Sequence, residues 1–281
     1  MANEQGMAEV RLPLFRAAVS STISNWKEKI LKRYGVQEYI WWRDFRKPVV
    51  FFGLYRPKDY LKLFWHRGER TIVWCGSDIF YAGWLFKLIQ KIKARHICEN
   101  HLQQAILRMA LRGIEPEIRY NFYGDPNKYP VSFKPSKTPH VWLCSHSHYG
   151  AEKQSGLNII EDIAKKLPEF TFHIYGFWPT IYQKMRNKNV IFHGNVSEEQ
   201  MDEEIKNYQA GLRLHQFDGF SEIIAKSILC GQYPISTINY PFIDCAKSEA
   251  ELIILLKALK GKQYPNHKAR EFYLKEMERT L

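Results

Sequence analysis

Residues 48–76 read PVVFFGLYRPKDYLKLFWHRGERTIVWCG, and this stretch decides the fold class. It contains two short, mostly apolar runs, at 48–53 and 70–76, with the amphipathic segment 57–67 between them. Apolar runs of about four to eight residues without polar alternation are typical of strands that are buried on both faces. Because parallel strands need a crossover connection, the pattern predicts a parallel sheet covered by helices.

The alternation of strands and helices continues toward the C-terminus. The first half is expected to add helices at 81–95 and 101–113 and strands at 96–98 and 117–122. Residues 124–138 hold three prolines among polar residues, which is the composition of a linker. After the linker we expect strands at 140–145, 170–176, 189–194, 211–216 and 233–236, and helices at 156–167, 197–208 and 221–230. The sequence therefore predicts two α/β domains, residues 1–137 and 138–281, with a ligand-binding cleft between them.

Positive charge is concentrated in the first half of the chain. Residues 1–138 contain 24 Lys and Arg against 12 Asp and Glu, whereas residues 139–281 contain 17 of each. Fifteen of the 41 aromatic residues lie between Tyr39 and Phe86, interleaved with basic residues. A surface with both properties suits a membrane, a lipid phosphate or a nucleic acid. The alternative is that most of these rings fill an ordinary core.

A leading amphipathic helix is predicted because apolar residues recur on one narrow stripe near the N-terminus. The stripe consists of Phe15, Val19, Ile23, Trp26 and Ile30, and Lys27, Lys29 and Lys32 lie beside it. Such a helix can lie on an anionic bilayer or pack on its own domain, and the sequence leaves both open.

The chain lacks the marks of several protein classes. Its apolar stretches are much shorter than the roughly 20 residues of a membrane-spanning helix, and residues 1–10 lack the apolar core of a secretory signal. Its five cysteines include no C-x-x-C pair, which argues against a disulfide framework or a structural zinc site. We therefore expect a cytoplasmic protein that can associate peripherally with the inner face of a membrane.

A series of features in residues 189–236 follows a known order. It runs from a strand ending at Gly194, through a helix that begins near Ser197, to a short strand, the DGF turn at 218–220, a helix, and Gly231 before a last strand. This order resembles the donor-binding half of the retaining glycosyltransferases of family four. The resemblance implies the GT-B fold, an α/β architecture of two Rossmann-like domains that face each other across a cleft. It also implies that the first domain binds the acceptor, that the second binds a nucleotide sugar, and that the last helix crosses back.

The acidic turn is the centre of the implied nucleotide-sugar site. Backbone N–H groups of Phe220 and Ser221 open a helix, where unpaired N–H groups and the helix dipole favour a diphosphate. The carboxylate of Asp218, next to Gly219, would then face the transferred sugar as a catalytic residue. Such a site is expected to work without a metal, and no cofactor is implied.

The position of the second acidic residue departs from the family pattern. The family places a second carboxylate on the nucleotide ribose, separated from the first by seven residues, but Lys226 stands there in this chain. An ammonium group only donates hydrogen bonds, so it cannot accept them from ribose hydroxyls. The alternative is that Glu222 and Lys226, four residues apart on one helix, form a solvated ion pair.

Two further groups of residues complete the implied nucleotide-sugar site. The loop after the strand at 140–145 offers His146, His148 and Lys153 to the phosphates, whereas the family commonly provides an arginine and a lysine. No other Cys or His clusters with these histidines in the sequence, so metal binding is not expected there. The ends of the next two strands offer a nucleobase pocket made of Tyr175, Gly176, Gly194, Asn195 and Val196.

In the first half, Asp78 is the leading acceptor-side residue. It follows a buried strand, so we expect its carboxylate to project into the cleft and to orient or deprotonate an acceptor hydroxyl. Capping of the next helix is the alternative. The other residues that follow strands and are expected to line the acceptor side are Gly53, Arg56, Glu99 and Asn100.

These features lead to three functional hypotheses. The first is a glycosyltransferase that moves a hexose-like unit, with retention, from a UDP- or GDP-sugar to a lipid-linked or glycan acceptor at a membrane. The second keeps this chemistry but places the sugar on a hydroxymethylated base of DNA. The third is a catalytically silent protein that binds a glycan or a partner, because fold resemblance alone does not establish chemistry.

Overall fold

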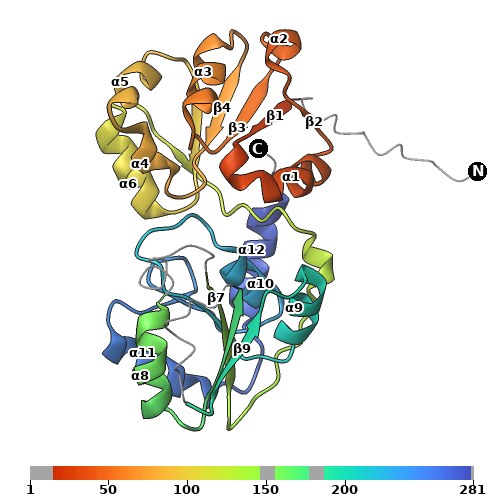
Figure 1. Ribbon diagram of the computed structural model, residues 1–281, viewed down its shortest axis with the longest axis vertical. Coiled ribbons are helices and arrows are strands. Elements are labelled where there is room, and N and C mark those ends of the chain that lie inside the picture. The colour runs from red at the N-terminus through yellow and green to blue at the C-terminus, as the bar shows by residue number, and fades with distance from the viewer. Residues whose placement is uncertain (1–14, 146–155, 177–186, 280–281) are drawn as a thin grey trace, which may run out of the picture.

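Two six-stranded sheets, each made only of parallel pairs, form two lobes in the computed structural model, which describes residues 15–145, 156–176 and 187–279. The strand order is β2-β1-β3-β4-β5-β6 in the first lobe and β12-β11-β10-β7-β8-β9 in the second. Figure 1 shows the lobes one above the other along the long axis of the molecule. The predicted α/β class and parallel sheets are confirmed.

The first lobe alternates short strands with short helices. Its strands are β1 (Arg16–Val19), β2 (Gln37–Glu38), β3 (Val49–Phe52), β4 (Arg70–Val73), β5 (Arg95–Cys98) and β6 (Glu117–Ile118). Its helices are α1 (Lys27–Tyr34), α2 (Trp41–Asp44), α3 (Pro57–Trp65), α4 (Asp78–Ala82), α5 (Phe86–Ile89) and α6 (His101–Ala110). Two 3-10 segments, η1 (Ser21–Trp26) and η2 (Gly83–Leu85), precede α1 and α5.

The helices of the first lobe cover the two faces of its sheet unequally. The chain crosses from β3 to β4, β5 and β6 in one direction, so right-handed connections place α3 to α6 on one face. Phe51 and Trp74 belong to the core of that face, together with Leu63 of α3 and Ile89 of α5. The opposite face carries α1, whose Ile30 is packed in a second core with Phe52 and other strand residues.

The second lobe follows the same plan. Its strands are β7 (His140–Ser145), β8 (Thr171–Gly176), β9 (Val190–Gly194), β10 (Ala210–Arg213), β11 (Ile235–Ser236) and β12 (Asp244–Cys245). Its helices are α8 (Leu157–Lys166), α9 (Glu198–Ile205), α10 (Glu222–Leu229), α11 (Glu249–Leu259) and α12 (His267–Glu278). Helix α12 packs on α10, and near its end Arg33 of α1 donates a hydrogen bond to the carbonyl of Met277.

The predicted leading helix at 15–30 is wrong in its first part. Residues Arg16–Val19 form β1, which pairs with both β2 and β3 and so lies inside the sheet. Ala17 is fully buried there. The apolar spacing of Phe15 and Val19 fits a helical stripe, but burial between two neighbouring strands decides the conformation. Ile30 faces the core, so the helix that does form packs on its own lobe.

The predicted helix at 81–95 is also shorter than expected. The structure breaks it into α4, η2 and α5, and Arg95 already belongs to β5. Gly83 has a φ of 40°, a conformation that a regular helix does not contain and that glycine adopts at little cost. Across the three described ranges, no helix has both the length and the apolar character needed to cross a bilayer.

Candidate functional site

Two adjoining cavities lie between the lobes. The first, of about 220 Å³, is lined by Trp26 and Glu99 of the first lobe and by Arg213 and residues 218–223 of the second. The second cavity, of about 290 Å³, lies between Lys29 and the ends of strands in the second lobe. Residues common to both are Asn25, Cys144, Met201, Glu222 and Lys226. Because carboxyl ends of parallel strands border these cavities, they occupy the place where open α/β sheets bind ligands.

The acidic turn at 218–221 is held at the first cavity by hydrogen bonds of its own side chains, by an ion pair and by the buried ring of Phe220. Asp218 accepts a hydrogen bond from the backbone N–H of Gly219 (2.9 Å) and forms an ion pair with Arg213 at the end of β10 (2.6 Å). Ser221 caps α10 by accepting from the backbone N–H of Ile223. The ring of Phe220 is buried and stacks on Tyr273 of α12, so the backbone of the turn faces the cleft.

Glu99 and Asn100, which follow β5 in the first lobe, contact this turn directly. Glu99 Oε2 accepts a hydrogen bond from the backbone N–H of Phe220 (3.0 Å), and Asn100 Nδ2 donates to the carbonyl of Asp218 (2.7 Å). The approach is so close that a Cβ on Gly219 would lie 2.0 Å from Glu99 Oε2. The first lobe therefore already occupies one of the N–H groups that sequence reasoning assigned to a diphosphate.

The Glu99 carboxyl group has an unusual environment. Glu99 is only 3% exposed, and its Oε1 atom accepts a hydrogen bond from Asn121. Burial raises the pKa of Glu99 to about 8, and the hydrogen bonds from Phe220 and Asn121 only partly oppose this effect. A carboxyl group of this kind in a cleft can hold or accept a proton near neutral pH.

The expectation that the Asp78 carboxylate projects into the cleft is wrong. Asp78 is fully buried, and its carboxylate accepts hydrogen bonds from the backbone N–H groups of Leu54, Cys75 and Ile79. Burial nevertheless raises the pKa of Asp78 to about 7. The side chain ties the ends of β3 and β4 to the start of α4, where Asp78 is the first helical residue and Ser77 is the N-cap.

The remaining acceptor-side predictions fall outside the lining of the two cavities. Gly53 is buried, and a Cβ there would meet the ring of Tyr55 at 2.7 Å. Arg56 is exposed, and its Nε donates to the hydroxyl of Thr22. Of the acceptor-side candidates, Glu99 and Asn100 are therefore the pair that the structure brings to the acidic turn.

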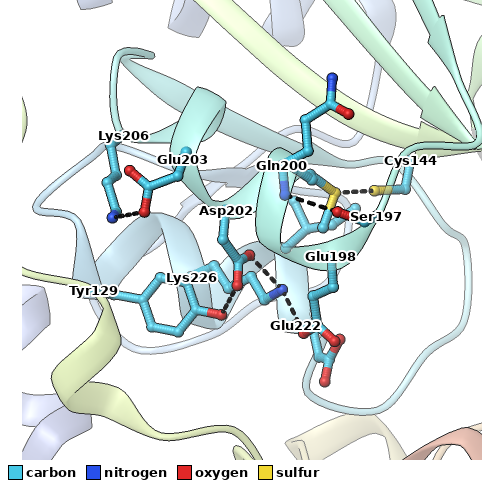
Figure 2. A network of polar contacts seen from close by, with 12 residues as sticks. Tyr129, Cys144, Ser197, Glu198, Gln200, Asp202, Glu203, Lys206, Glu222 and Lys226 are labelled. Atoms are coloured by element: carbon cyan, nitrogen blue, oxygen red, sulfur yellow. Dashed lines mark hydrogen bonds and ion pairs between the residues drawn. The ribbon is translucent and has the colours of Figure 1, made fainter.

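Lys226 lies at the centre of an ionic network rather than on a solvated surface (Figure 2). Its side chain is 1% exposed, and its Nζ lies 3.0 Å from Glu198 Oε1 and 2.7 Å from Asp202 Oδ1 on α9. The hydroxyl of Tyr129 also donates to Asp202 (2.6 Å). Burial by itself lowers the pKa of Lys226, but the surrounding carboxylates outweigh it and the net shift is upward. A solvated pair with Glu222 is thus excluded.

Glu222 pairs instead with a lysine of the other lobe. Lys29 Nζ on α1 lies 3.3 Å from Glu222 Oε1 and 2.7 Å from Glu198 Oε1. Glu198 thus pairs with one lysine from each lobe. Burial on its own would raise the pKa of Glu198, but the two lysines outweigh it and lower this pKa to about 2. These contacts hold α1 over the second cavity.

The residues predicted for a nucleobase pocket lie mostly around the second cavity. Tyr175, Gly176, Asn195 and Val196 line it, whereas Gly194 does not. The ring of Tyr175 is buried, and its hydroxyl donates to Glu204 (2.5 Å). His146, His148 and Lys153 lie outside the described residues. Within the part of the chain that the structure covers, no group of three or more His, Cys, Asp and Glu could hold a metal ion.

Comparisons with known proteins identify the architecture. No protein family description and no curated sequence matches the chain. The lipopolysaccharide outer core galactosyltransferase WaaB superimposes with a TM-score of 0.59 over 94% of this chain and 95% of its own, at 14% identity. The chain has the GT-B fold.

Other GT-B structures agree with this assignment. TarM of S. aureus, in a complex that contains UDP, has a TM-score of 0.58 and 15% identity over 82% of this chain, which spans about half (51%) of TarM. HepE of Anabaena, in complex with UDP and glucose, has a TM-score of 0.56 and 13% identity over 82% of this chain and 73% of HepE.

Sequence reasoning missed three charged residues of this GT-B cleft. Arg213 follows from no motif, although its place within the predicted strand 211–216, five residues before Asp218, is a usable signal. Lys29 was assigned to the flank of a helix, and Glu198 was placed in the predicted helix 197–208 without a role in the site. Their roles depend on contacts between the lobes and between α9 and α10, which no local pattern contains.

Proposed function

We propose that this chain is a glycosyltransferase that moves a sugar from a nucleotide-sugar donor to an acceptor in the cleft between its lobes. The observation that carries the proposal is the position of the acidic turn. Residues 218–221 line the first cavity, and four residues predicted for the nucleobase line the adjoining cavity. The GT-B structures that contain UDP support a nucleotide as the donor's leaving group.

In this proposal the start of α10 binds the diphosphate. Among the described residues, the backbone N–H groups of Ser221 and Glu222 have no hydrogen-bond partner, and they lie at the positive end of the helix dipole. The Phe220 N–H is held by Glu99, so a nucleotide sugar that uses this group must displace that carboxylate. Arg213 and Lys29 lie nearby, each already paired with carboxylates, and a diphosphate that displaces those carboxylates would gain their positive charge without a bound metal.

The transferred hexose is placed against Asp218, with Glu99 on the acceptor side. Glu99 replaces Asp78 in this assignment because its carboxyl group lines the cavity and Asp78 does not. Once displaced from the Phe220 N–H, Glu99 can orient an acceptor hydroxyl or take up its proton. The family resemblance implies retention, with the departing phosphate assisting the acceptor.

The acceptor is proposed to be a lipid-linked or glycan molecule at a membrane surface. The excess of basic residues in the first half supports a phosphate-bearing environment. The same charge supports hydroxymethylated DNA as the second candidate. A gel shift with duplex DNA that is steeply weakened by salt would favour DNA over the membrane.

Thermal unfolding with UDP-, GDP-, ADP- and CMP-sugars tests the proposal. At about one hundred times its dissociation constant, a bound sugar nucleotide should add about 2.7 kcal/mol of stability. Asp218→Ala should abolish sugar transfer while the protein still folds. The control Asp162→Ala, on the exposed face of α8, should leave both sugar transfer and the fold unchanged. Failure of every nucleotide sugar to stabilise the protein would favour the silent binding protein, and full activity of Asp218→Ala would remove this residue from the site.

A further inference from the structure

The first lobe exposes large apolar side chains on one layer of helices. They are between 37% and 74% exposed and comprise Trp41, Trp42, Leu61, Phe64, Trp65, Phe80, Tyr81, Trp84 and Leu88. All belong to α2–α5 and η2, which follow one another across the face of the sheet opposite α1. Exposed apolar patches of this extent mark interaction surfaces. We call this surface the aromatic–basic face.

The charge of the same segment is strongly one-sided. Residues 39–98 contain twelve Lys and Arg but four Asp and Glu. Three of the four acids are 0–5% exposed, namely Asp44, Asp59 and Asp78. The carboxylate of each accepts a hydrogen bond from a backbone N–H group of its own lobe. The fourth acid, Glu69, is exposed. The solvent-facing charge is therefore almost entirely positive.

We propose that the aromatic–basic face binds the surface of an anionic lipid bilayer. Trp and Tyr side chains prefer the headgroup level of a membrane, where their rings are buried and their polar atoms stay hydrated. Lys and Arg around them attract anionic lipids. Leu61 and Leu88 favour a bilayer over a nucleic acid, because aliphatic side chains enter the acyl boundary but offer bases no stacking surface.

The aromatic–basic face extends to the mouth of the cleft. Phe80 on α4 packs against Phe217 of the second lobe with ring centroids 4.3 Å apart, and Phe217 directly precedes Asp218. A bilayer held by this face would thus present a lipid-linked acceptor near the acidic turn. This last step rests on the proposed function, whereas the membrane binding does not.

Co-sedimentation with vesicles tests whether the aromatic–basic face binds anionic bilayers. Phosphatidylcholine vesicles with about 30% phosphatidylglycerol should bind the protein, and pure phosphatidylcholine should bind it much more weakly. Lys58→Gln with Lys62→Gln should weaken binding about thirtyfold, from about 1 kcal/mol for each cation at the surface. Trp42→Ser with Trp84→Ser should weaken it on the order of tenfold. All four side chains avoid both cavities, so nucleotide-sugar binding should stay unchanged.

A double variant on the second lobe provides the matched control. Ile254 and Tyr264 are 65% and 76% exposed, and Ile254→Ser with Tyr264→Ser should leave vesicle binding intact. The proposal is overturned if the protein ignores anionic vesicles, if the control weakens binding as much as the face variants, or if duplex DNA binds and vesicles do not. If the protein binds vesicles but does not respond to nucleotide sugars, the proposed function is rejected and membrane binding by the aromatic–basic face is retained.

Discussion

Replacing Lys226 by glutamate would restore the carboxylate that the family resemblance places at this position, and we expect the protein to lose stability without gaining nucleotide-sugar affinity. The Lys226 ammonium group is 1% exposed and lies 3.0 Å from Glu198 and 2.7 Å from Asp202. A glutamate there would put a third carboxylate beside these two, one helical turn after Glu222. The two neighbouring carboxylates therefore favour a cation at position 226 and disfavour an anion.

The size of the effect follows from the burial of the three groups. Removing one partner of a buried ion pair costs about 3–5 kcal/mol. Glu198 and Asp202 are 40% and 16% exposed, so solvent partly replaces the lost ammonium and we expect about 2–3 kcal/mol for Lys226→Met. A carboxylate about 5 Å from another repels it by about 3 kcal/mol at an effective dielectric constant of about 20. Because proton uptake limits that repulsion, we expect a total of about 4–6 kcal/mol for Lys226→Glu at pH 7.

Urea unfolding of the full chain, followed by circular dichroism, measures these differences. The loss for Lys226→Glu should shrink at pH 5, where protonation of the added carboxyl group removes the repulsion. Lys206→Met is the control, because Lys206 pairs with the 75% exposed Glu203 and should lose less than about 0.5 kcal/mol. The reasoning is refuted if Lys226→Glu matches Lys226→Met in stability at pH 7, or if it binds a nucleotide sugar more tightly than the wild type.

Two further changes probe the contact between the lobes, and a third probes the ion pair of the acidic turn. The folded pKa of Glu99 is raised to about 8, so between about pH 4.5 and pH 8 the folded state keeps a proton that the unfolded state has released. Stability should therefore fall as pH rises through this window, and Glu99→Gln should flatten the fall in a series of urea titrations. Gly219→Ala would place a Cβ 2.0 Å from Glu99 Oε2 and should cost about 1–3 kcal/mol in thermal unfolding, with recovery in a double variant that also carries Glu99→Ala. Arg213→Gln removes the partner of Asp218 and should weaken nucleotide-sugar binding at least tenfold by calorimetry; unchanged affinity would exclude Arg213 from the site.

The fold class was predictable because it depends on local composition. The apolar runs at 49–52 and 70–73 are strands in the structure, and the helix between them lies at Pro57–Trp65. The strand Arg16–Val19 was not predictable in the same way, because its sequence RAAV is not a continuous run of large apolar residues, and Phe15 and Val19 also fit the spacing of a helix. Its pairing with β3, more than thirty residues later, fixes its conformation.

The acidic turn could be located from sequence, but its partners could not. Strand, turn, capping serine and helix are consecutive residues, so their order points to the cleft. Glu99 reaches Phe220 across 121 residues, and Lys29 reaches Glu222 across 193. Asp78 misled the prediction because an aspartate after a strand either faces a ligand or accepts hydrogen bonds from the backbone of its own lobe, and only the positions of the Leu54 and Cys75 N–H groups distinguish these cases.

The structure also explains why net charge alone was a poor guide to the cleft. Cations that line the two cavities are paired with carboxylates: Arg213 with Asp218, Lys29 with Glu198 and Glu222, and Lys226 with Glu198 and Asp202. On the aromatic–basic face, by contrast, acids are mostly buried under the helices and the cations face solvent. The unbalanced field of the first half therefore acts outward from that face, where it can attract a charged surface. Inside the cleft, an anionic ligand must rely on backbone N–H groups and on exchange with carboxylates already bound there, of which Glu99 on the Phe220 N–H is the clearest case.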